Sequence, residues 1–397
     1  MMETFENVAA RIILKKGRAK SVNNFHPWVF SGAVERVEGE FEPGDIVRIH
    51  SFDDQFQAKG FINPRSKIFA RVLSFEDVPI DRDFFRHRIR RALAFREKYL
   101  ARFSNGYRLI NSDADGLSGL IVDRYQHYLV VQISSLGMYR LKSVMIELLK
   151  ELVAPEGILE RSESVSLEDE GLQPVREVLW GTIPDRIQIE EHGVKFWVDV
   201  VHGQKTGFFL DQRENRLRVG KLVQPGVELL NCFSYTGGFS VYAALNGART
   251  VSVDISEGAL ELARENFRLN GLRPEEHEFV VADVFDYLRE MSRNFSFIIL
   301  DPPAFIKKKR HIQKGARGYK DINRLAIQKI LPDGLILSCS CSHYMEWDLF
   351  QKVLFSAARD AERDVQILGK YSHPADHPID IYHPESEYLK AFLLRVI

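Results

Sequence analysis

The sequence predicts an α/β protein whose C-terminal half is an open, mostly parallel sheet of the Rossmann-like type. The first observation is a short apolar run, Glu228 to Cys232, followed by a glycine turn and by a segment with helical spacing, Phe239 to Leu245. The second is another apolar run, which starts at Thr250 and ends on an acidic residue, Asp254. Together these segments form one strand-helix-strand unit, from which parallel sheets are built.

The turn of this unit indicates a nucleotide-type cofactor. Gly237 and Gly238 let the backbone approach a ligand, and Asp254 is placed to accept hydrogen bonds from ribose hydroxyls. The dinucleotide pattern G-x-G-x-x-G is absent, so a pyrophosphate would be poorly held. S-adenosylmethionine has ribose and adenine but no phosphate, and it is the cofactor we expect. An ordinary doubly wound domain with turn glycines is the competing explanation for Gly237 alone.

Two later apolar runs also end in acidic residues. Asp283 follows the run 278–282, where a carboxylate can meet the adenine amine, and Asp301 follows the run 297–300. A single aspartate at the end of a strand is common in such folds. Three of them in order, at positions 254, 283 and 301, favour a cofactor-binding edge of the sheet.

Composition excludes several classes of protein. Of the 397 residues 45% are hydrophobic and 27% are charged, and the net charge is −1. These values are ordinary for a soluble globular protein, and any nucleic-acid contact must come from local basic patches. There is no apolar run of membrane-spanning length and no secretory leader, so we expect a cytoplasmic protein without a membrane partner. The three cysteines, Cys232, Cys339 and Cys341, lack disulfide or zinc spacing, and we expect no metal.

The first 78 residues have the pattern of a small β-domain. Its expected strands are 12–14, 46–49, 57–62 and 68–73. Lys15, Lys16 and Arg18 stand close to Phe25 and Trp28, and cations mixed with aromatic faces are typical of RNA binding. A solvated strand edge protected by lysines explains the charges equally well.

A central α+β domain is expected over residues 79–186. Its helix begins at an Asp81 cap and runs to about Arg102, and a second helix covers 141–152. Its expected strands are 107–111, 120–133 and 157–161. The stretch 162–174 is acidic and polar, which indicates an exposed loop.

The third domain is expected over residues 187–397. After a hairpin at 188–200, the stretch 201–216 suits neither a strand nor a helix start, and it is placed to fold over the methionine end of the cofactor. Beyond Asp301 a basic stretch, 302–320, holds seven Lys or Arg residues and no acid. Its position at a strand end favours phosphate contact over a merely solvated loop. The expected remaining elements are a helix at 322–330, a strand at 334–337, a helix at 346–362 and a strand at 389–396.

Asp301 and Cys341 follow successive strands of the expected sheet, so both should face the cofactor crevice. A thiol beside a methyl donor suggests methylation at carbon 5 of a pyrimidine, because a thiolate that adds to carbon 6 turns the ring into a nucleophile. Asp301 is placed to hold N3 of the base. The competing explanation for Cys341 is that it is simply a small buried residue at the end of a strand. Cys339 is the weaker nucleophile, and Cys232 is expected to pack in the core.

These motifs resemble one family closely. The segments KTGFFLDQREN, LNCFSYTGGFSV, VSVDIS, ILDPPAF, GARGYKDIN and SCS are similar to those of the ribosomal RNA large subunit methyltransferase I family. The resemblance covers nearly the whole chain, and it implies a PUA-like β-barrel, a central α+β domain and a class I methyltransferase domain. It also implies methylation of cytosine carbon 5 in large-subunit rRNA, with Cys341 as nucleophile and Asp301 at the target base.

The resemblance implies two further sets of site residues. The expected cofactor contacts are Gln212, Arg213, Phe233, Ser234, Tyr235, Thr236, Gly237, Asp254, Ile255, Asp283, Val284 and Asp301. The expected RNA contacts are Lys15, Lys16, Arg18, Lys307, Lys308, Lys309 and Arg317. Many RNA cytosine-C5 enzymes have a second cysteine just after the Asp-Pro pair, whereas Ala304 and Phe305 stand here. The base that removes the carbon-5 proton is therefore unassigned.

Two other functions fit parts of the pattern. Asp301-Pro302-Pro303 followed by Phe305 resembles the signature of amino-group methyltransferases, in which an aromatic ring stacks on a flipped base. A non-catalytic RNA-binding factor of ribosome assembly is the second alternative. The sequence leaves open a homodimer, the nucleotide modified, and whether naked rRNA or an assembling subunit is the substrate.

Overall fold

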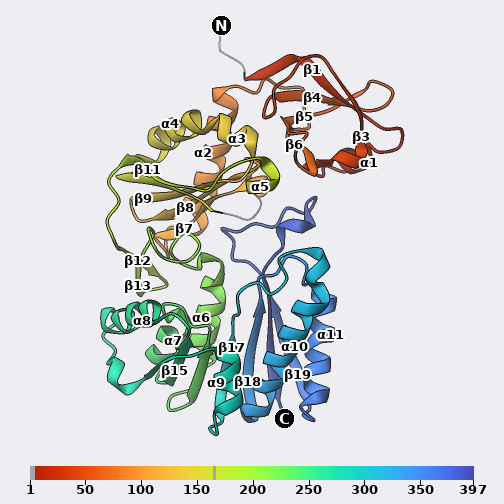
Figure 1. Ribbon diagram of the computed structural model, residues 1–397. Coiled ribbons are helices and arrows are strands. Elements are labelled where there is room, and N and C mark those ends of the chain that lie inside the picture. The colour runs from red at the N-terminus through yellow and green to blue at the C-terminus, as the bar shows by residue number, and fades with distance from the viewer. Residues whose placement is uncertain (1–4, 164–166) are drawn as a thin grey trace. The chain divides into compact units, whose positions relative to one another are not determined.

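The computed structural model describes residues 5–163 and 167–397, which form two compact units (Figure 1). The first unit comprises Met1–Ile189, Val198–Leu210 and Ala375–Ser386. The second comprises Glu190–Trp197, Asp211–Pro374 and Glu387–Ile397. A hairpin of β12 (Ile187–Glu191) and β13 (Val194–Val198) lies where the chain passes from the first to the second. The division into three domains stays a prediction.

The first unit begins with a six-stranded sheet in the order β2-β6-β5-β4-β1-β3. Its elements are β1 (Glu6–Leu14), α1 (Lys20–Asn23), β2 (Trp28–Phe30), β3 (Val34–Glu38), β4 (Ile46–His50), β5 (Phe56–Ile62) and β6 (Ile68–Ser74). Alternate apolar residues such as Ile12, Val47 and Ala58 fill its core. All four expected strands are present, although β1 starts at Glu6 rather than at Ile12. Strands β2 and β3 were not expected, because they are short and largely solvent-facing.

The second sheet of this unit has the order β11-β10-β9-β8-β7. The elements here are α2 (Arg82–Tyr99), β7 (Gly106–Asn111), β8 (Leu120–Tyr125), β9 (Tyr128–Ile133), α3 (Leu136–Arg140), α4 (Lys142–Val153), β10 (Gly157–Ser162), α5 (Leu167–Glu170) and β11 (Val175–Gly181). The predicted cap is confirmed, because the Asp81 side chain accepts the Phe84 N–H at 2.9 Å. The expected loop at 162–174 contains α5, while its residues 164–166 lie outside the described residues.

A segment from near the end of the chain completes the first unit. Within residues 375–386 the Asp376 carboxylate accepts the Arg108 N–H at 3.0 Å, and the Pro378 carbonyl accepts from Asn111 Nδ2 at 3.1 Å. The Arg96 guanidinium, buried and paired with Asp115, also donates to the Asp376 carbonyl at 3.0 Å. That residues 375–386 belong to the first unit could not be predicted, because they lie far along the chain from the residues that they contact.

The second unit is a seven-stranded sheet in the order β16-β15-β14-β17-β18-β20-β19. Its strands are β14 (Glu228–Cys232), β15 (Arg249–Asp254), β16 (Glu278–Val281), β17 (Phe295–Leu300), β18 (Ile330–Ser340), β19 (Val365–Tyr371) and β20 (Lys390–Val396). The five strands from β16 to β18 are mutually parallel, and β20 runs antiparallel to β18 and β19. This is the predicted Rossmann-like sheet.

Helices cover both faces of this sheet (Figure 1). They are α6 (Arg213–Leu222), α7 (Gly238–Leu245), α8 (Glu257–Leu269), α9 (Val284–Glu290), α10 (Ile312–Lys329) and α11 (Trp347–Asp360). The alternation of strand side chains divides the core into two clusters. Leu230 and Cys232 belong to the cluster that includes α10 and α11, whereas Leu229 belongs to the cluster of α6 and α7.

Three expectations about this unit were wrong. Helix α10 begins at Ile312 rather than at 322, so half of the expected basic loop is helical. Its buried face is formed by Gly315, Tyr319 and Ile322. Lysines and arginines lie between these residues in the sequence, and they make the narrow apolar pattern hard to detect. Helix α6 begins at Arg213, where no helix start was expected. Strand β18 runs from 330 to 340 and includes Cys339, whereas the expected strand covered only 334–337.

Gly315 is required where α10 passes the loop that follows β17. A Cβ atom at this position would overlap the Ile306 side chain and would lie 2.9 Å from the Phe305 carbonyl oxygen. The helix can therefore approach the Asp301-Pro302-Pro303 loop only because residue 315 has no side chain.

We expect Gly315→Ala to lower the free energy of unfolding by about 1–3 kcal/mol, because the new methyl group must displace this loop. Gly258→Ala is the matched control, since Gly258 also lies within a helix, α8, and its Cβ would meet no atom within 4 Å. There the better helix propensity of alanine should raise stability by up to about 1 kcal/mol. Denaturant unfolding of both variants checks the opposite signs, and equal effects would contradict the packing argument.

Candidate active site

The candidate site lies at the carboxyl edge of the parallel strands in the second unit. Cys232 of β14 pairs in register with Val253 of β15 and with Leu300 of β17. The last residues of these strands therefore end side by side. Beyond them lie the turn 233–237 and Asp301, and β18 next to β17 leads to Cys341. The structure thus brings together, at one edge, the groups that the sequence placed after separate strands.

The turn after β14 has an unusual backbone. Phe233, Tyr235 and Gly237 have φ angles of 58°, 47° and 76°. For the two aromatic residues this left-handed conformation costs on the order of 1–3 kcal/mol each, so the surroundings must hold it. Asp254 does so, since its Oδ2 accepts the Tyr235 N–H at 2.8 Å, and Asn266 Nδ2 donates to the Thr236 carbonyl at 3.0 Å. The turn is therefore fixed in a strained shape before any ligand binds.

Asp254 and its neighbour suit the adenosine part of the expected cofactor. The Asp254 carboxylate is buried, and each oxygen accepts one backbone N–H, from Ser256 at 2.9 Å and from Tyr235. A carboxylate oxygen has further acceptor capacity, which ribose hydroxyls can use. Ile255 is 75% exposed, which is unusual for a large apolar side chain beside a buried carboxylate. Its surface is available to cover an adenine ring.

Asp283 caps α9 and keeps one oxygen for another partner. Its Oδ1 accepts the N–H groups of Phe285 and Asp286 at 2.8 and 3.2 Å. Its Oδ2 accepts no hydrogen bond from the described residues, and the side chain is exposed. This oxygen has the capacity to accept from an exocyclic amine, and its contact with adenine stays a prediction. The side chain of Val284, also an expected contact, is buried in the core, and its role at the cofactor stays a prediction.

The segment that precedes α6 is joined directly to Asp301. Gln212 Nε2 donates to Asp301 Oδ1 at 2.9 Å, and Asn215 Nδ2 holds the Gln212 side chain from the other side at 2.7 Å. Asp211 accepts the Tyr388 hydroxyl at 2.8 Å. Gln212 is therefore in place beside the candidate catalytic carboxylate, whereas the Arg213 side chain is fully buried within the unit.

Cys341 is the accessible thiol of the three. It is half-buried, and its Sγ lies 3.9 Å from the carbonyl oxygen of Pro302, in the loop that carries Asp301. Cys232 and Cys339 are fully buried, and burial raises the pKa of both thiols. The nearby charge of Asp301 raises the pKa of Cys339 further. Since a reactive cysteine must reach the thiolate form and its substrate, Cys341 is the candidate nucleophile.

Several supporting residues were missed by sequence reasoning. Ser342 Oγ accepts the Ile306 N–H at 3.1 Å and lies 3.0 Å from the Tyr319 hydroxyl, so it connects the loop after β17 with α10. Burial raises the pKa of Tyr319 to about 12, and the phenol stays protonated. The only sequence signal for these supporting residues was the segment Ser340-Cys341-Ser342. The sequence around it does not show which groups the two hydroxyls contact.

The expected RNA-binding cations are exposed in both units. Lys307, Lys308, Lys309 and Arg317 surround the start of α10, and the described residues offer them no ion-pair partner. In the first unit Lys15, Lys16 and Arg18 lie between β1 and α1, where Lys15 Nζ donates only to the Gly32 carbonyl at 3.3 Å. Cations without a protein counter-charge are free to bind phosphates.

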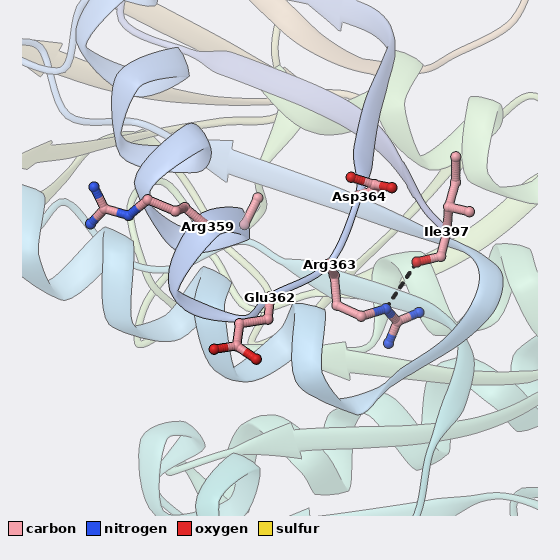
Figure 2. Close-up of a pocket in the computed structure, with 6 residues that line it drawn as sticks. Arg359, Glu362, Arg363, Asp364 and Ile397 are labelled. Atoms are coloured by element: carbon pink, nitrogen blue, oxygen red, sulfur yellow. Dashed lines mark hydrogen bonds between the residues drawn. The ribbon is translucent and has the colours of Figure 1, made fainter.

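A pocket of about 360 Å³ lies at the opposite edge of the same sheet (Figure 2). It is lined by residues at the end of α11 and by Ile397, whose carbonyl accepts from Arg363 Nε at 3.0 Å. Strand β20 runs antiparallel to β18, so its last residues lie far along the sheet from Cys341. This pocket is therefore separate from the candidate active site.

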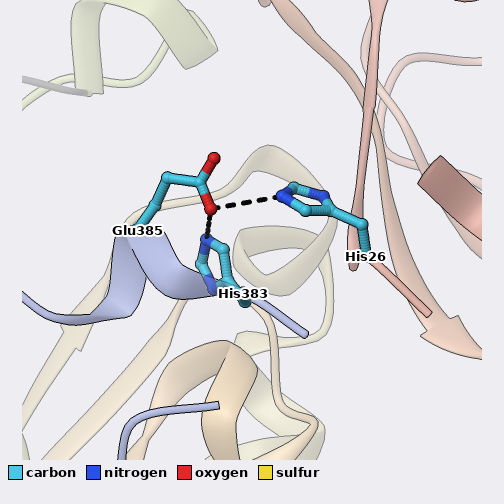
Figure 3. Close-up of side chains that lie close together, drawn as sticks. All are labelled: His26, His383 and Glu385. Carbon is cyan, nitrogen blue, oxygen red and sulfur yellow. Dashed lines mark hydrogen bonds and ion pairs between the residues drawn. The ribbon is translucent and has the colours of Figure 1, made fainter. Parts of the chain in front are cut away.

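One group in the first unit has the residue types of a metal site. His26, His383 and Glu385 converge, with His26 Nε2 3.2 Å from Glu385 Oε2 (Figure 3). However, the Trp28 N–H donates to His26 Nδ1 at 3.1 Å, which places the hydrogen of a neutral ring on Nε2, facing the carboxylate. A metal would need that nitrogen's lone pair. The group is thus arranged as a hydrogen-bonded cluster that holds the segment 375–386.

This cluster should make the first unit sensitive to acid. Burial lowers the pKa of His383, and it outweighs the nearby carboxylates, which act to raise that pKa. Burial acts to raise the pKa of Glu385, but hydrogen bonds from its own backbone and from His26 outweigh it, and the net shift is downward. Both folded pKa values lie below the unfolded ones, so the stabilisation is present at neutral pH and is lost as pH falls, for His383 from about 6.5 downward.

We therefore expect the thermal unfolding midpoint to fall between pH about 7.5 and about 5.5, and to fall less in His383→Gln, which has no group that titrates there. His202→Gln is the control, because His202 is exposed and should leave the pH dependence unchanged. An identical pH profile for wild type and His383→Gln would refute the role of this histidine.

Of the helices that the described residues form, none combines the length and apolar character needed to cross a membrane. Comparison with protein families agrees with the geometry. A PUA-like domain matches residues 12–75, and an S-adenosylmethionine-dependent methyltransferase family matches residues 172–395, more than half of the chain. S-adenosylmethionine is therefore the methyl donor.

Curated relatives match along nearly the full length. "Ribosomal RNA large subunit methyltransferase I" of Vibrio cholerae is 44% identical over 97% of this chain and 99% of its own, and that of Pseudoalteromonas atlantica is 42% identical over 98% and 100%. A solved Streptococcus mutans structure described as a SAM-dependent methyltransferase has the same fold, with a TM-score of 0.85 at 24% identity over 97% of this chain and 100% of that one. The chain belongs to the ribosomal RNA large subunit methyltransferase I family.

Proposed function

We propose that this protein methylates carbon 5 of a cytosine in large-subunit rRNA, in the cytoplasm, through a covalent adduct with Cys341. The observation that carries the proposal is the accessible Cys341 thiol beside the Asp301 loop, at the sheet edge that also bears the cofactor turn. The rRNA substrate is supported by the names of relatives that match over nearly the whole chain.

The residues at this edge fit the cofactor. Asp254 and Asp283 have acceptor capacity for the ribose and the adenine amine, and Ile255 offers an apolar face. The strained turn from Phe233 to Gly237 supplies a close backbone approach. S-adenosylmethionine, when bound, supplies a methyl group on a positively charged sulfur. The assignment of the individual contacts is part of this proposal.

The chemistry begins at carbon 6 of the cytosine. The Cys341 thiolate forms a bond to carbon 6, and the electrons of the ring double bond move toward carbon 5 and N3. A proton shared between N3 and Asp301 neutralises the charge, and Gln212 orients that carboxyl through its 2.9 Å hydrogen bond. Carbon 5 would then bond to the methyl group as the methyl–sulfur bond breaks, and the sulfur would leave as a neutral thioether. Loss of the carbon-5 proton to a base restores the double bond, and the Cys341 thiolate leaves.

Methylation of an exocyclic amino group is the alternative reaction, and the packing of Phe305 bears on it. It would use Phe305 to stack on a flipped base. Here the Phe305 ring packs on Tyr319 and Phe285, with ring centroids 4.7 and 5.9 Å apart, so much of its surface is already used within the protein. This packing favours the cysteine-dependent reaction, in which Phe305 needs no contact with the base.

The nucleophile can be tested with a matched pair of variants. We expect Cys341→Ala to lower 5-methylcytidine formation at least about 1000-fold, because the other two cysteines, Cys232 and Cys339, are buried. Cys339→Ala should retain most activity, since Cys339 is buried in β18 and its thiol is strongly held in the protonated form. The assay is methyl transfer from labelled S-adenosylmethionine to unmodified rRNA, with product nucleosides identified. An N-methylated product with both variants active would support the alternative.

The cations of the first unit can be tested separately from the chemistry. The triple variant Lys15→Ala, Lys16→Ala, Arg18→Ala should weaken RNA binding and reduce the slope of log affinity against log salt by about 0.7–0.9 per lost phosphate contact. Single-turnover methyl transfer at saturating RNA should stay close to wild type. Lys352→Ala is the control, because Lys352 is exposed but paired with Asp348. An equal loss of turnover at saturation would contradict a role in binding alone.

A further inference from the structure

Exposed aromatic rings meet in the first unit, where the residues after α1 contact the segment 375–386. Phe25 and Tyr382 are 47% and 51% exposed, which is a large fraction for aromatic side chains. Their ring centroids lie 5.2 Å apart, with the ring planes tilted by 55°. The two residues stand near opposite ends of the sequence, so only the packing of the first unit brings them together.

A third exposed ring extends this surface. Phe30 is 45% exposed, and its ring centroid lies 6.2 Å from that of His26, the residue after Phe25. The ring centroid of His26 lies 5.4 Å from that of His383, the residue after Tyr382 (Figure 3). The histidine cluster thus connects the three exposed rings. We call Phe25, Phe30 and Tyr382 the aromatic platform.

The backbone of Phe25 is held in an unfavourable conformation. Its φ angle is 61°, in the left-handed region that bulky side chains rarely adopt. Two backbone hydrogen bonds of 2.9 Å hold this turn, from the Phe25 N–H to the Val22 carbonyl and from the His26 N–H to the Ser21 carbonyl. The ring contacts Phe75 but stays half exposed, so packing explains the strain only in part. Residues strained in this way cluster at sites that bind ligands.

Exposed cations stand close to the platform. Lys15 Nζ donates to the carbonyl of Gly32, two residues after Phe30. The Lys67 carbonyl accepts the N–H of Ser31, which directly follows Phe30, at 3.0 Å. The exposed cations of this region that form no ion pair with the described residues are Lys15, Lys16, Arg18, Lys20 and Lys67.

Exposed rings beside such cations fit an RNA segment whose bases are unpaired. An unpaired base stacks on an aromatic ring, while the phosphates on either side of it bind cations. A duplex hides its base faces and could use the cations alone. The carboxylates of the segment 375–386 are partly neutralised, since Asp380 accepts the Tyr382 N–H at 3.0 Å and Glu385 is bonded to His26. A second copy of this chain would bring the same cations together, which is unfavourable.

We propose that the aromatic platform stacks the bases of an unpaired segment of rRNA, while the neighbouring cations bind its phosphates. The platform joins the PUA-like domain to the segment 375–386, so RNA recognition by the first unit uses residues from both ends of the chain. The inference rests on the proposed rRNA substrate. It adds the kind of RNA structure that this surface recognises and the rings that recognise it.

The test measures binding of the full chain to an unstructured RNA of about 12 nucleotides and to the same strand annealed to its complement. Tyr382→Leu keeps an apolar side chain but removes the ring. It should weaken binding of the single strand about 5- to 100-fold and leave duplex binding unchanged. The slope of log affinity against log salt should not change, because no phosphate contact is lost. Tyr382→Phe keeps the ring and should bind like wild type.

Two further variants serve as replicate and control. Phe25→Leu should act like Tyr382→Leu, and it keeps the test decisive if the latter does not fold. Tyr139→Leu is the control, because Tyr139 is a tyrosine of α3 that is 44% exposed and lies outside the platform. It should bind both RNAs like wild type.

Several results would overturn the proposal. Wild type that binds single strand and duplex equally well would do so, as would ring variants that bind the single strand normally. An equal loss of both RNAs would show a general structural defect in place of lost stacking. Sedimentation of the protein alone covers the remaining case, since ring variants that shift a monomer–dimer equilibrium and bind RNA normally would make this surface an interface between copies.

Methyl transfer distinguishes this inference from the proposed function. Cys341-dependent formation of 5-methylcytidine by a protein whose ring variants bind single-stranded RNA normally would keep the cytosine reaction and reject the platform. Weakened single-strand binding in the ring variants, together with an N-methylated product from wild type, would keep the platform and reject the cytosine reaction.

Discussion

The parallel pairing of β14, β17 and β18 is the constraint on which the candidate site depends. Because these strands run in one direction with their ends in register, the strained turn, Asp301 and Cys341 emerge at the same edge. The strained turn, the carboxylate and the thiol are thus collected at one edge by the pairing of the strands.

The loops at this edge are held by a few polar and steric contacts. Asp254 fixes the turn after β14, Gln212 reaches Asp301, and Ser342 ties the loop after β17 to its neighbour. Gly315 allows α10 to approach that loop closely. Each hydrogen bond is short and at least partly buried, so the site is organised before substrate arrives, as catalysis by precise positioning requires.

Much of this arrangement could be predicted from the sequence. Three apolar runs in order end in Asp254, Asp283 and Asp301, and this pattern is typical of the carboxyl edge of a parallel sheet. The parts that escaped prediction depend on tertiary contacts. Helix α10 was expected too late because its buried face is a narrow stripe among charges. Ser342 was not singled out, since its hydrogen bond with the Ile306 N–H depends on how the two loops pack.

The most direct test of the central claim is to trap the adduct. RNA that carries 5-fluorocytidine at the target position has no carbon-5 proton to lose, so addition and methylation should proceed but release should fail. We predict a stable covalent complex that forms only with S-adenosylmethionine present and that maps by mass spectrometry to Cys341. Full methyl-donor binding with no covalent complex, or a cross-link to another residue, would contradict the account.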